Sequence, residues 1–316
     1  MSAGDGVGME TILDTGIAQI PGRTGSRARM DSMESTLAPW LAYLLTVLPG
    51  VALVGVVVAL LPRQAHGARI LMLILGFIFT RDALSTQGLW EFGVVGNGAE
   101  SASAGSGIPT LWLRFTDDPL ALLVMAVASL ALVAGVLWAC RDLRWTVLWA
   151  GRRWWTSVLV GLLGAALIVL PFLFLYGTIG QWFPALHSVA PALVTPAVPV
   201  DNRGGAVAGG VLLVLALFAL CGNLVEEVLF RGFLQAHLED QLPGRTGRWR
   251  AALLSALIFA AGHLFLAYNI TGLGWPILAF TFLEGLVCAV IALRHGVLGA
   301  SIAHAGAIFV LASGLV

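Results

Sequence analysis

Apolar residues fill long stretches of the chain, and polar residues fall mainly in the shorter segments between them. Several apolar stretches approach the roughly 20 residues that a helix needs to cross the hydrocarbon of a bilayer. A closed bundle of such helices satisfies its own backbone hydrogen bonds in lipid. The pattern therefore predicts an all-α, polytopic transmembrane helix bundle of about eight spans, at 38–61, 68–90, 119–140, 155–176, 206–237, 251–268, 275–293 and 297–315.

Two kinds of residue interrupt these spans. Arg81 and Asp82 lie inside the second span, which therefore fits the pattern least well. Pro49 and Pro171 lie within spans or at their ends, where a membrane bundle tolerates a kink.

The chain divides into three regions. Residues 1–35 are polar and glycine-rich, with no apolar core of a signal peptide, and are expected to be a disordered tail. Met30 or Met33 is an alternative start. An N-terminal transmembrane region of about four spans follows at 36–204, and residues 205–316 carry the motifs described below.

Composition fits a membrane protein. Hydrophobic residues make up 59% of the chain and charged residues 11%, whereas a soluble domain has about 25% charged residues. The net charge of zero indicates no nucleic-acid partner. All 17 basic residues are arginine, and we interpret this as genomic base-composition bias. We therefore expect a multi-pass protein of a bacterial plasma membrane.

The three cysteines and the loop arginines complete this picture. Cys140, Cys221 and Cys288 are isolated in apolar stretches, which indicates neither disulfides nor a zinc knuckle. The arginines concentrate in alternate loops, and the positive-inside rule makes these loops cytoplasmic, with both termini outside. The arginine-rich loops are 62–69, 141–154, 238–250 and 294–296.

Four places in the C-terminal half put ionisable side chains at membrane depth. Such a side chain costs several kcal/mol in lipid, about 3 on insertion scales, and is retained when it is paired or functional. The positions are the group Glu226, Glu227 and Arg231, then His263, Glu284 and His304. We interpret Glu284 as a buried structural carboxylate, either protonated or paired with a neighbouring helix.

Helical spacing separates the two adjacent glutamates. Glu227 and Arg231 are i,i+4 neighbours and are predicted to form a helix-locking salt bridge. Glu226 points about 100° away around the helix, so we predict that it is the free carboxylate. Asn223 lies one turn before Glu226 on nearly the same face and is expected to hydrogen-bond its carboxylate.

Glu226, His263 and His304 come from three different spans and suit hydrolysis if they meet. A carboxylate and an imidazole together deprotonate a water, while a second imidazole stabilises an oxyanion. The same three side chains are alternatively ligands for a divalent metal such as zinc, which lowers the pKa of bound water. The sequence leaves both mechanisms open.

The arrangement Glu226-Glu227-xxx-Arg231-Gly232, with Phe259-xxx-His263 on the next span and His304 on the last, resembles the CPBP family. This is the CAAX-protease and bacteriocin-processing group of intramembrane proteases, also called the Abi family. The resemblance covers about 205–312.

The resemblance implies an intramembrane endopeptidase and a role for each matching residue. Glu226 would be the general base acting with His263 on the attacking water, and His304 would help to bind the oxyanion. Glu227 and Arg231 would support the site, and Phe259 would pack beside His263. One position departs from the family pattern, because its third motif is usually HxxxN and residue 308 is isoleucine.

The missing asparagine leaves two outcomes open. Losing one oxyanion donor costs about 100-fold or more in rate. Either Asn223, Asn269 or Ser301 substitutes for it, or activity is low or absent. An intramembrane protease that cleaves a peptide or membrane protein is the first hypothesis. The alternatives are a catalytically silent scaffold or bacteriocin-immunity-type protein, and a transporter with a proton-coupled carboxylate at Glu226 or Glu284.

Overall fold

The computed structural model describes residue 48 and residues 51–86, 119–174, 209–244, 246–270 and 275–313. The chain divides into two compact units, Met1–Leu45 and Thr46–Val316, and every described residue belongs to the second. The predicted tail at 1–35 lies outside the described residues.

Regular structure in the described ranges is helical throughout, which confirms the all-α prediction there. Two stretches are π-helical and one is a short 3₁₀ turn. The elements are the short helix Val51–Leu60, α2 (His66–Thr86), α4 (Pro119–Ala139), η1 (Arg144–Thr146), α5 (Trp154–Phe174), α8 (Gly209–Glu227), η5 (Val228–Gln235), α9 (Ala236–Gln241), α10 (Gly247–Ala261), η6 (Leu266–Ile270) and α11 (Trp275–Ser313).

Four of the described helical stretches are long and apolar enough to cross a membrane: Leu122–Ala139, Trp154–Pro171, Gly209–Gln241 and Ile277–Ser313. The prediction of about eight spans is therefore not confirmed. α10 has 15 residues, which span only about 22 Å, less than the roughly 30 Å of a hydrocarbon core. α11 merges the two predicted spans 275–293 and 297–315 into one kinked element.

The kink in α11 lies at Gly296, where the sequence predicts a turn between two spans. Its φ of 65° and ψ of −166° are not helical, and a Cβ there would lie 2.2 Å from the Leu148 carbonyl oxygen. The backbone N–H groups of Val297 and Leu298 instead donate to the carbonyls of Leu148 and Trp149, each at 2.8 Å. The glycine therefore lets the loop before α5 lie against the start of the second arm of α11.

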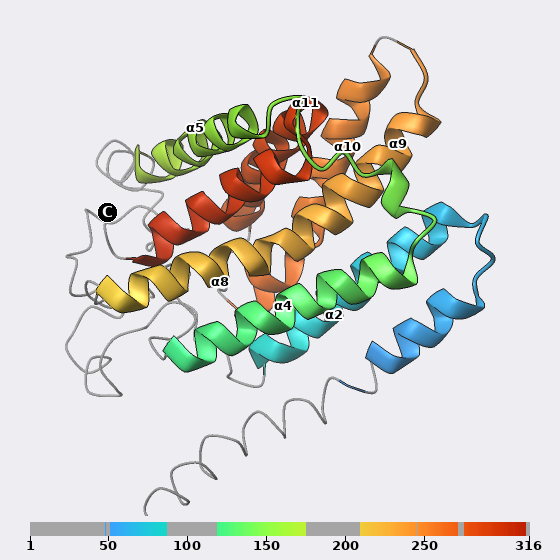
Figure 1. Ribbon diagram of the computed structural model, residues 1–316, viewed down its shortest axis with the longest axis horizontal. Helices are drawn as coiled ribbons and strands as arrows, with labels where there is room; N and C mark the ends of the chain where they lie inside the picture. The colour runs from blue at the N-terminus through green and yellow to red at the C-terminus, as the bar shows by residue number, and fades with distance from the viewer. Residues whose placement is uncertain are drawn as a thin grey trace, which may run out of the picture. The chain divides into compact units, whose positions relative to one another are not determined.

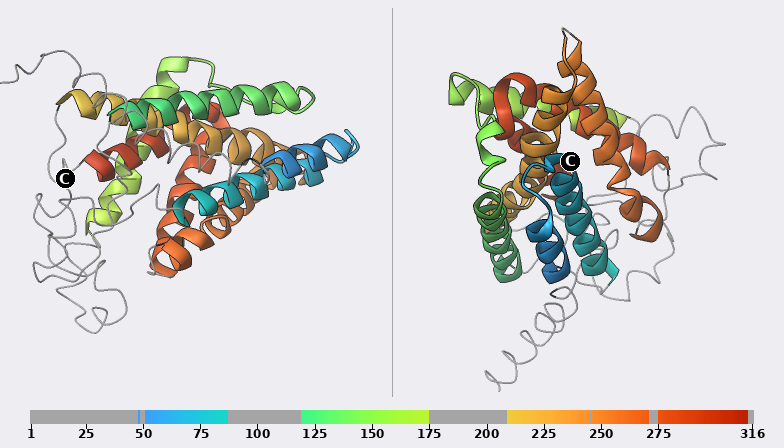
Figure 2. Two further views of the ribbon diagram at one scale, coloured as in Figure 1. Left: turned by 90° about the horizontal axis from the view of Figure 1, so that it is seen from below. Right: turned by 90° about the vertical axis from the view of Figure 1, so that its right-hand side faces the viewer.

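α8 packs on one side against α4 and on another against α11 (Figure 1). Leu122 of α4 and Phe218 of α8 share one buried cluster. A second cluster joins α2, η5 and α10 through Ile74, Phe230 and Phe259. The short helix Val51–Leu60 lies beside α2 in both views of Figure 2. Through these contacts, α8 and η5 have neighbours from both the N-terminal region and the C-terminal third of the chain.

Leucine and tryptophan side chains cover the outside of several helices. Leu163 and Leu170 of α5 and Trp154 at its start are exposed, and so is Trp138 near the end of α4. A helix that faces water would carry charged residues at such positions. A helix that faces lipid can expose leucine and tryptophan there. The described part of the chain thus has the surface of an integral membrane protein.

The arginine-rich loops meet at one end of the helices. Arg69 forms a 2.5 Å ion pair with Asp142, which joins the first two of these loops. Arg248 of the third loop donates to the carbonyl of Leu293, the residue directly before the fourth loop. The hydrogen bonds beside Gly296 join the second loop to the fourth. This grouping agrees with the prediction that all four loops lie on one side of the membrane.

Candidate active site

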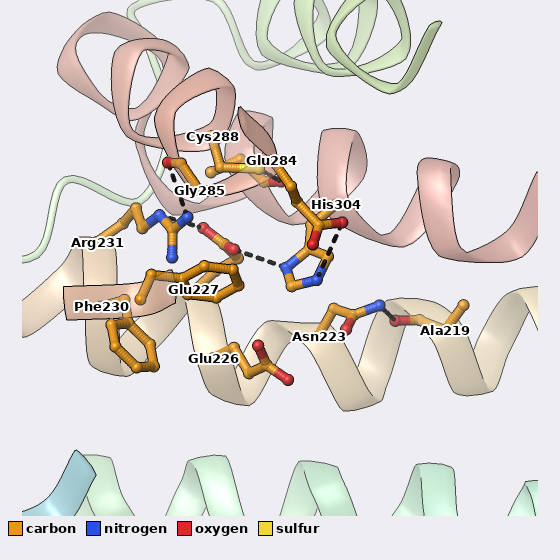
Figure 3. Close-up of polar contacts among 12 residues, drawn as sticks. Ala219, Asn223, Glu226, Glu227, Phe230, Arg231, Glu284, Gly285, Cys288 and His304 are labelled. Atoms are coloured by element: carbon orange, nitrogen blue, oxygen red, sulfur yellow. Dashed lines mark hydrogen bonds and ion pairs between the residues drawn. The ribbon is translucent and has the colours of Figure 1, made fainter. Parts of the chain in front are cut away.

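Glu226 and Glu227 end the α-helical part of α8 and point to different neighbours, as their spacing predicts (Figure 3). Both side chains are buried. Their helix continues through η5 and α9 as one 33-residue stretch from Gly209 to Gln241, so the two carboxylates lie near its middle. A buried pair of acids at mid-helix requires partners on the surrounding elements.

Glu227 faces α11 and forms the predicted salt bridge. Arg231 Nε lies 3.1 Å from Glu227 Oε2, and both side chains are fully buried. The Arg231 Nη2 group donates to the Gly285 carbonyl at 3.0 Å, and its guanidinium lies 4.4 Å from the centre of the Phe259 ring. These contacts confirm the predicted pair and fasten η5 to α10 and α11.

His304 belongs to the same side of α8. Its Nδ1 donates to Glu227 Oε1 at 2.8 Å, and its Nε2 lies 3.6 Å from Glu284 Oε1 (Figure 3). Glu284 and His304 come from the two arms of α11 on either side of Gly296. Glu284 therefore lies beside His304, an arrangement that fits either state predicted for it, and both imidazole nitrogens of His304 face carboxylates.

Glu226 faces the opposite way and is not the free carboxylate that the sequence predicts. Arg81 Nη1 of α2 contacts Glu226 Oε1 as an ion pair. The prediction was wrong because helical spacing describes only neighbours on the same helix, whereas Arg81 lies 145 positions away. In the sequence, Arg81 is visible only as an interruption of the second span. A charged residue at membrane depth is usually paired, so the position of Arg81 could have indicated an acidic partner on another helix.

His263 lies two residues after the end of α10 and approaches the second oxygen of Glu226. His263 Nδ1 donates to the Phe259 carbonyl at 2.8 Å, so in the neutral ring Nε2 carries the lone pair. That Nε2 lies 3.8 Å from Glu226 Oε2. The Phe259 ring packs on the imidazole with centroids 4.5 Å apart, in agreement with the predicted contact.

The structure therefore brings Glu226 and His263 together, with Phe259 between them and the second group of charges. The Phe259 ring also lies 5.6 Å from the His304 ring. His304 belongs to the neighbourhood but, among the polar contacts of the described residues, it joins Glu227 and Glu284 instead of Glu226. Of the three predicted residues, Glu226 and His263 therefore form a pair, and His304 lies nearby with other partners.

Asn223 does not support Glu226 as predicted. Its side-chain amide donates to the Ala219 carbonyl at 2.8 Å, one turn back on the same helix (Figure 3). Ser301 was another proposed substitute for the asparagine that is absent at Ile308. Its hydroxyl is buried and has no hydrogen-bond partner among the described residues. The side chain of the third proposed substitute, Asn269, lies outside the described residues.

The π-helix η5 begins directly after Glu227 and carries Arg231. π-Helical turns are rare in proteins, and those that occur often lie at functional sites. Two neighbours accommodate this one: Ser255 Oγ of α10 donates to the Phe230 carbonyl at 3.0 Å, and Gly232 leaves room for Val147. A Cβ at Gly232 would lie 3.3 Å from Val147 Cγ1. The wider turn of η5 is thus held by a hydrogen bond from α10 and by close packing against Val147.

The three residues predicted as an alternative zinc site do not meet in the geometry of a metal site. Among the described residues, no three His, Cys, Asp or Glu side chains are arranged to hold a metal ion. The reason is that the nitrogens of His304 face Glu227 and Glu284, while Glu226 faces Arg81 and His263.

Together these features define a membrane-embedded helix bundle with a buried carboxylate–imidazole pair. Residues 208–310 match the model of the Rce1-like family, described as type II CAAX prenyl endopeptidase Rce1-like. The match covers about a third of the chain and confirms the family resemblance predicted from the sequence. The comparisons with curated proteins and with solved structures found no match.

Proposed function

We propose that this protein is an intramembrane endopeptidase in which Glu226 and His263 activate the attacking water. One observation carries the proposal: Glu226 Oε2 and His263 Nε2 lie 3.8 Å apart in a buried position, within the segment that matches an endopeptidase family. Glu226 Oε2 has no hydrogen-bond partner among the described residues. A water hydrogen-bonded to both atoms satisfies that oxygen.

The reaction proceeds in two proton transfers. The Glu226–His263 pair takes one proton from the water as its oxygen attacks the peptide carbonyl carbon. The tetrahedral intermediate then collapses with cleavage of the C–N bond, and the pair returns the proton to the leaving nitrogen. One water is consumed, and the products are a new carboxyl terminus and a new amino terminus. Such general acid–base catalysis contributes about 10²–10⁴-fold to the rate.

His304 is assigned to the oxyanion, as the family resemblance implies. Its Nε2 faces Glu284 Oε1 at 3.6 Å, so this role requires Nε2 to carry a proton and to exchange that contact for the oxyanion. Its hydrogen bond to Glu227 fixes the orientation of its ring, and Glu227 is itself held by Arg231. Ile308 supplies no hydrogen-bond donor, so the site has one group fewer than the usual family pattern. We therefore expect slow turnover compared with a site that has the asparagine, by about 100-fold.

The substrate is proposed to be a peptide or membrane-protein segment that reaches the site from the bilayer of a bacterial plasma membrane. Two substrate chemistries are to be compared: a peptide with a prenylated cysteine near its C-terminus, as the matched family's description indicates, and the same peptide without the prenyl group. Zinc dependence is tested in the same assay, because a chelator would abolish metal-dependent cleavage and added zinc would restore it.

The decisive experiment compares peptide termini in membranes from cells making the wild type or Glu226→Gln at matched levels. Glutamine keeps the shape of the side chain but removes the base, so we expect specific new termini to fall by at least about 100-fold. Arg250→Gln is a control for a surface change, since this side chain is exposed. Identical terminus profiles for the wild type and Glu226→Gln would refute hydrolysis at this site.

A catalytically silent scaffold or immunity-type protein is the second candidate. Ile308 favours it, because the site then lacks one oxyanion donor, and so does the Arg81–Glu226 ion pair, which gives Glu226 a structural partner. In this case Glu226→Gln changes stability or partner binding and leaves the terminus profile unchanged.

A further inference from the structure

The two oxygens of the Glu226 carboxylate have different surroundings. Oε1 contacts the Arg81 guanidinium, while Oε2 faces His263 Nε2 and has no hydrogen-bond partner among the described residues. A carboxylate on a glutamate turns about its terminal bond with a broad torsional preference. A contact that holds one oxygen therefore also sets the direction of the other.

Arg81 reaches this position from a helix that is itself well anchored. α2 packs through Ile70 and Ile74 into the cluster that includes Phe230 and Phe259. At its other end, Arg69 forms the 2.5 Å ion pair with Asp142. The Arg81 side chain remains 24% exposed, whereas that of Glu226 is 2% exposed. The cation thus approaches the buried acid from the accessible side.

We propose that Arg81 is a positioning residue for the reaction: it holds Glu226 Oε1 so that Oε2 points at His263 and the attacking water. This inference rests on the proposed hydrolysis and assigns part of the active site to α2. That helix lies outside residues 208–310, the segment that matches the endopeptidase family. The N-terminal region therefore completes the site by supplying the group that orients the base.

Both the charge and the shape of arginine are needed for this role. A carboxylate desolvated to 2% exposure requires a compensating charge. The planar guanidinium fixes a carboxylate in direction, whereas a lysine ammonium acts as a point charge on a flexible stem. Arg81→Lys should therefore keep part of the function that Arg81→Gln loses.

The test uses the full-length protein in proteoliposomes, with a quenched fluorescent peptide in prenylated and unprenylated forms as the probe. Misplacing a catalytic group by about 1 Å costs about 100-fold in rate. We expect Arg81→Gln to lower kcat about 100-fold with KM changed by no more than about threefold, because substrate binding is not the lost interaction. The kcat of Arg81→Lys should be at least about tenfold higher than that of Arg81→Gln.

Arg69→Gln is the matched control on the same helix, since it breaks the ion pair to Asp142 away from Glu226. It should lower Tm with little change in kcat. An Arg81→Gln variant that folds and has wild-type or higher kcat, or that loses only as much as Arg69→Gln, would overturn the proposal.

The failures of the two proposals are distinguishable. If Glu226→Gln cleaves the probe as fast as the wild type, the proposed hydrolysis fails. If Glu226→Gln is inactive and Arg81→Gln is not impaired, only the positioning role fails. A double-mutant cycle on Tm tests the pairing without any activity: Arg81→Gln and Glu226→Gln should be non-additive, and additive shifts would refute the contact.

Discussion

Glu226 and Glu227 are chemically identical neighbours, yet each has a different set of partners. Glu227 is enclosed by Arg231 and His304, while Glu226 meets Arg81 and His263. Helical spacing predicts their divergence and the Glu227–Arg231 pair, because both are properties of one helix. The contact between Arg81 and Glu226 could not be predicted in this way, because it joins two helices, α2 and α8, that are far apart in the sequence.

The Glu227 interactions should be mainly structural. Glu227→Gln leaves the fully buried Arg231 without its countercharge, so we expect the free energy of unfolding to fall by about 3 kcal/mol or more. Glu239→Gln is the control, because its partner Arg248 is largely exposed and such pairs are worth about 1 kcal/mol or less. Unfolding of the purified proteins in micelles measures both, and equal losses would contradict the structural role.

At the scale of elements, the site depends on close contact between α10 and the first arm of α11. Gly285 presents its carbonyl to Arg231 and leaves space for the Phe259 ring. A Cβ at Gly285 would lie 2.9 Å from Phe259 Cδ1 and 3.4 Å from the Ala256 Cα, so the aromatic ring beside His263 would have to move.

Gly285→Ala should therefore impair both stability and cleavage. Overpacking of this kind costs about 1–3 kcal/mol, and the displaced Phe259 ring should carry His263 with it. Gly135→Ala on α4 is the matched control, since nothing lies within 4 Å of its added Cβ. Thermal unfolding and peptide cleavage of the two variants provide the comparison. An unchanged Gly285→Ala protein would show that α10 and α11 do not pack this tightly.

The breaks between elements are as informative as the helices. The sequence predicts a turn at 294–296, and the structure has the break at Gly296, whose positive φ suits glycine. The π-helix η5 was not predicted, because a single extra residue per turn leaves no clear change in an apolar pattern. Glu226 lies near the middle of the helical stretch Gly209–Gln241, and α10 ends at Ala261, two residues before His263, whose Nε2 reaches Glu226 Oε2.

At the scale of the whole molecule, the four arginine-rich loops should lie on the cytoplasmic side. Cysteines introduced at Arg152 and Asp240, both exposed, should react with a membrane-impermeant maleimide in inside-out vesicles and not in intact spheroplasts. The native protein gives little background, because Cys140, Cys221 and Cys288 are buried. Labelling of the two positions from opposite sides would contradict the shared location of these loops.

The sequence alone determined the helical class, the membrane environment and the Glu227–Arg231 pair, while the contact of Phe259 with His263 was implied by the family resemblance. The first three follow from composition or from neighbours within about one helical turn, and local chemistry is sufficient to predict them. The family resemblance likewise came from residues at recognisable spacings in the C-terminal third.

Only the tertiary structure decided which groups meet across helices. It pairs Arg81 with Glu226 over 145 positions, turns His304 towards Glu227 and Glu284, and turns Asn223 back to its own helix. Long-range pairing depends on how whole helices pack and rotate against one another, and the hydrophobic pattern of a lipid-facing helix does not specify that rotation. For this reason the catalytic candidates could be named from the sequence, while the residue that orients Glu226 required the fold.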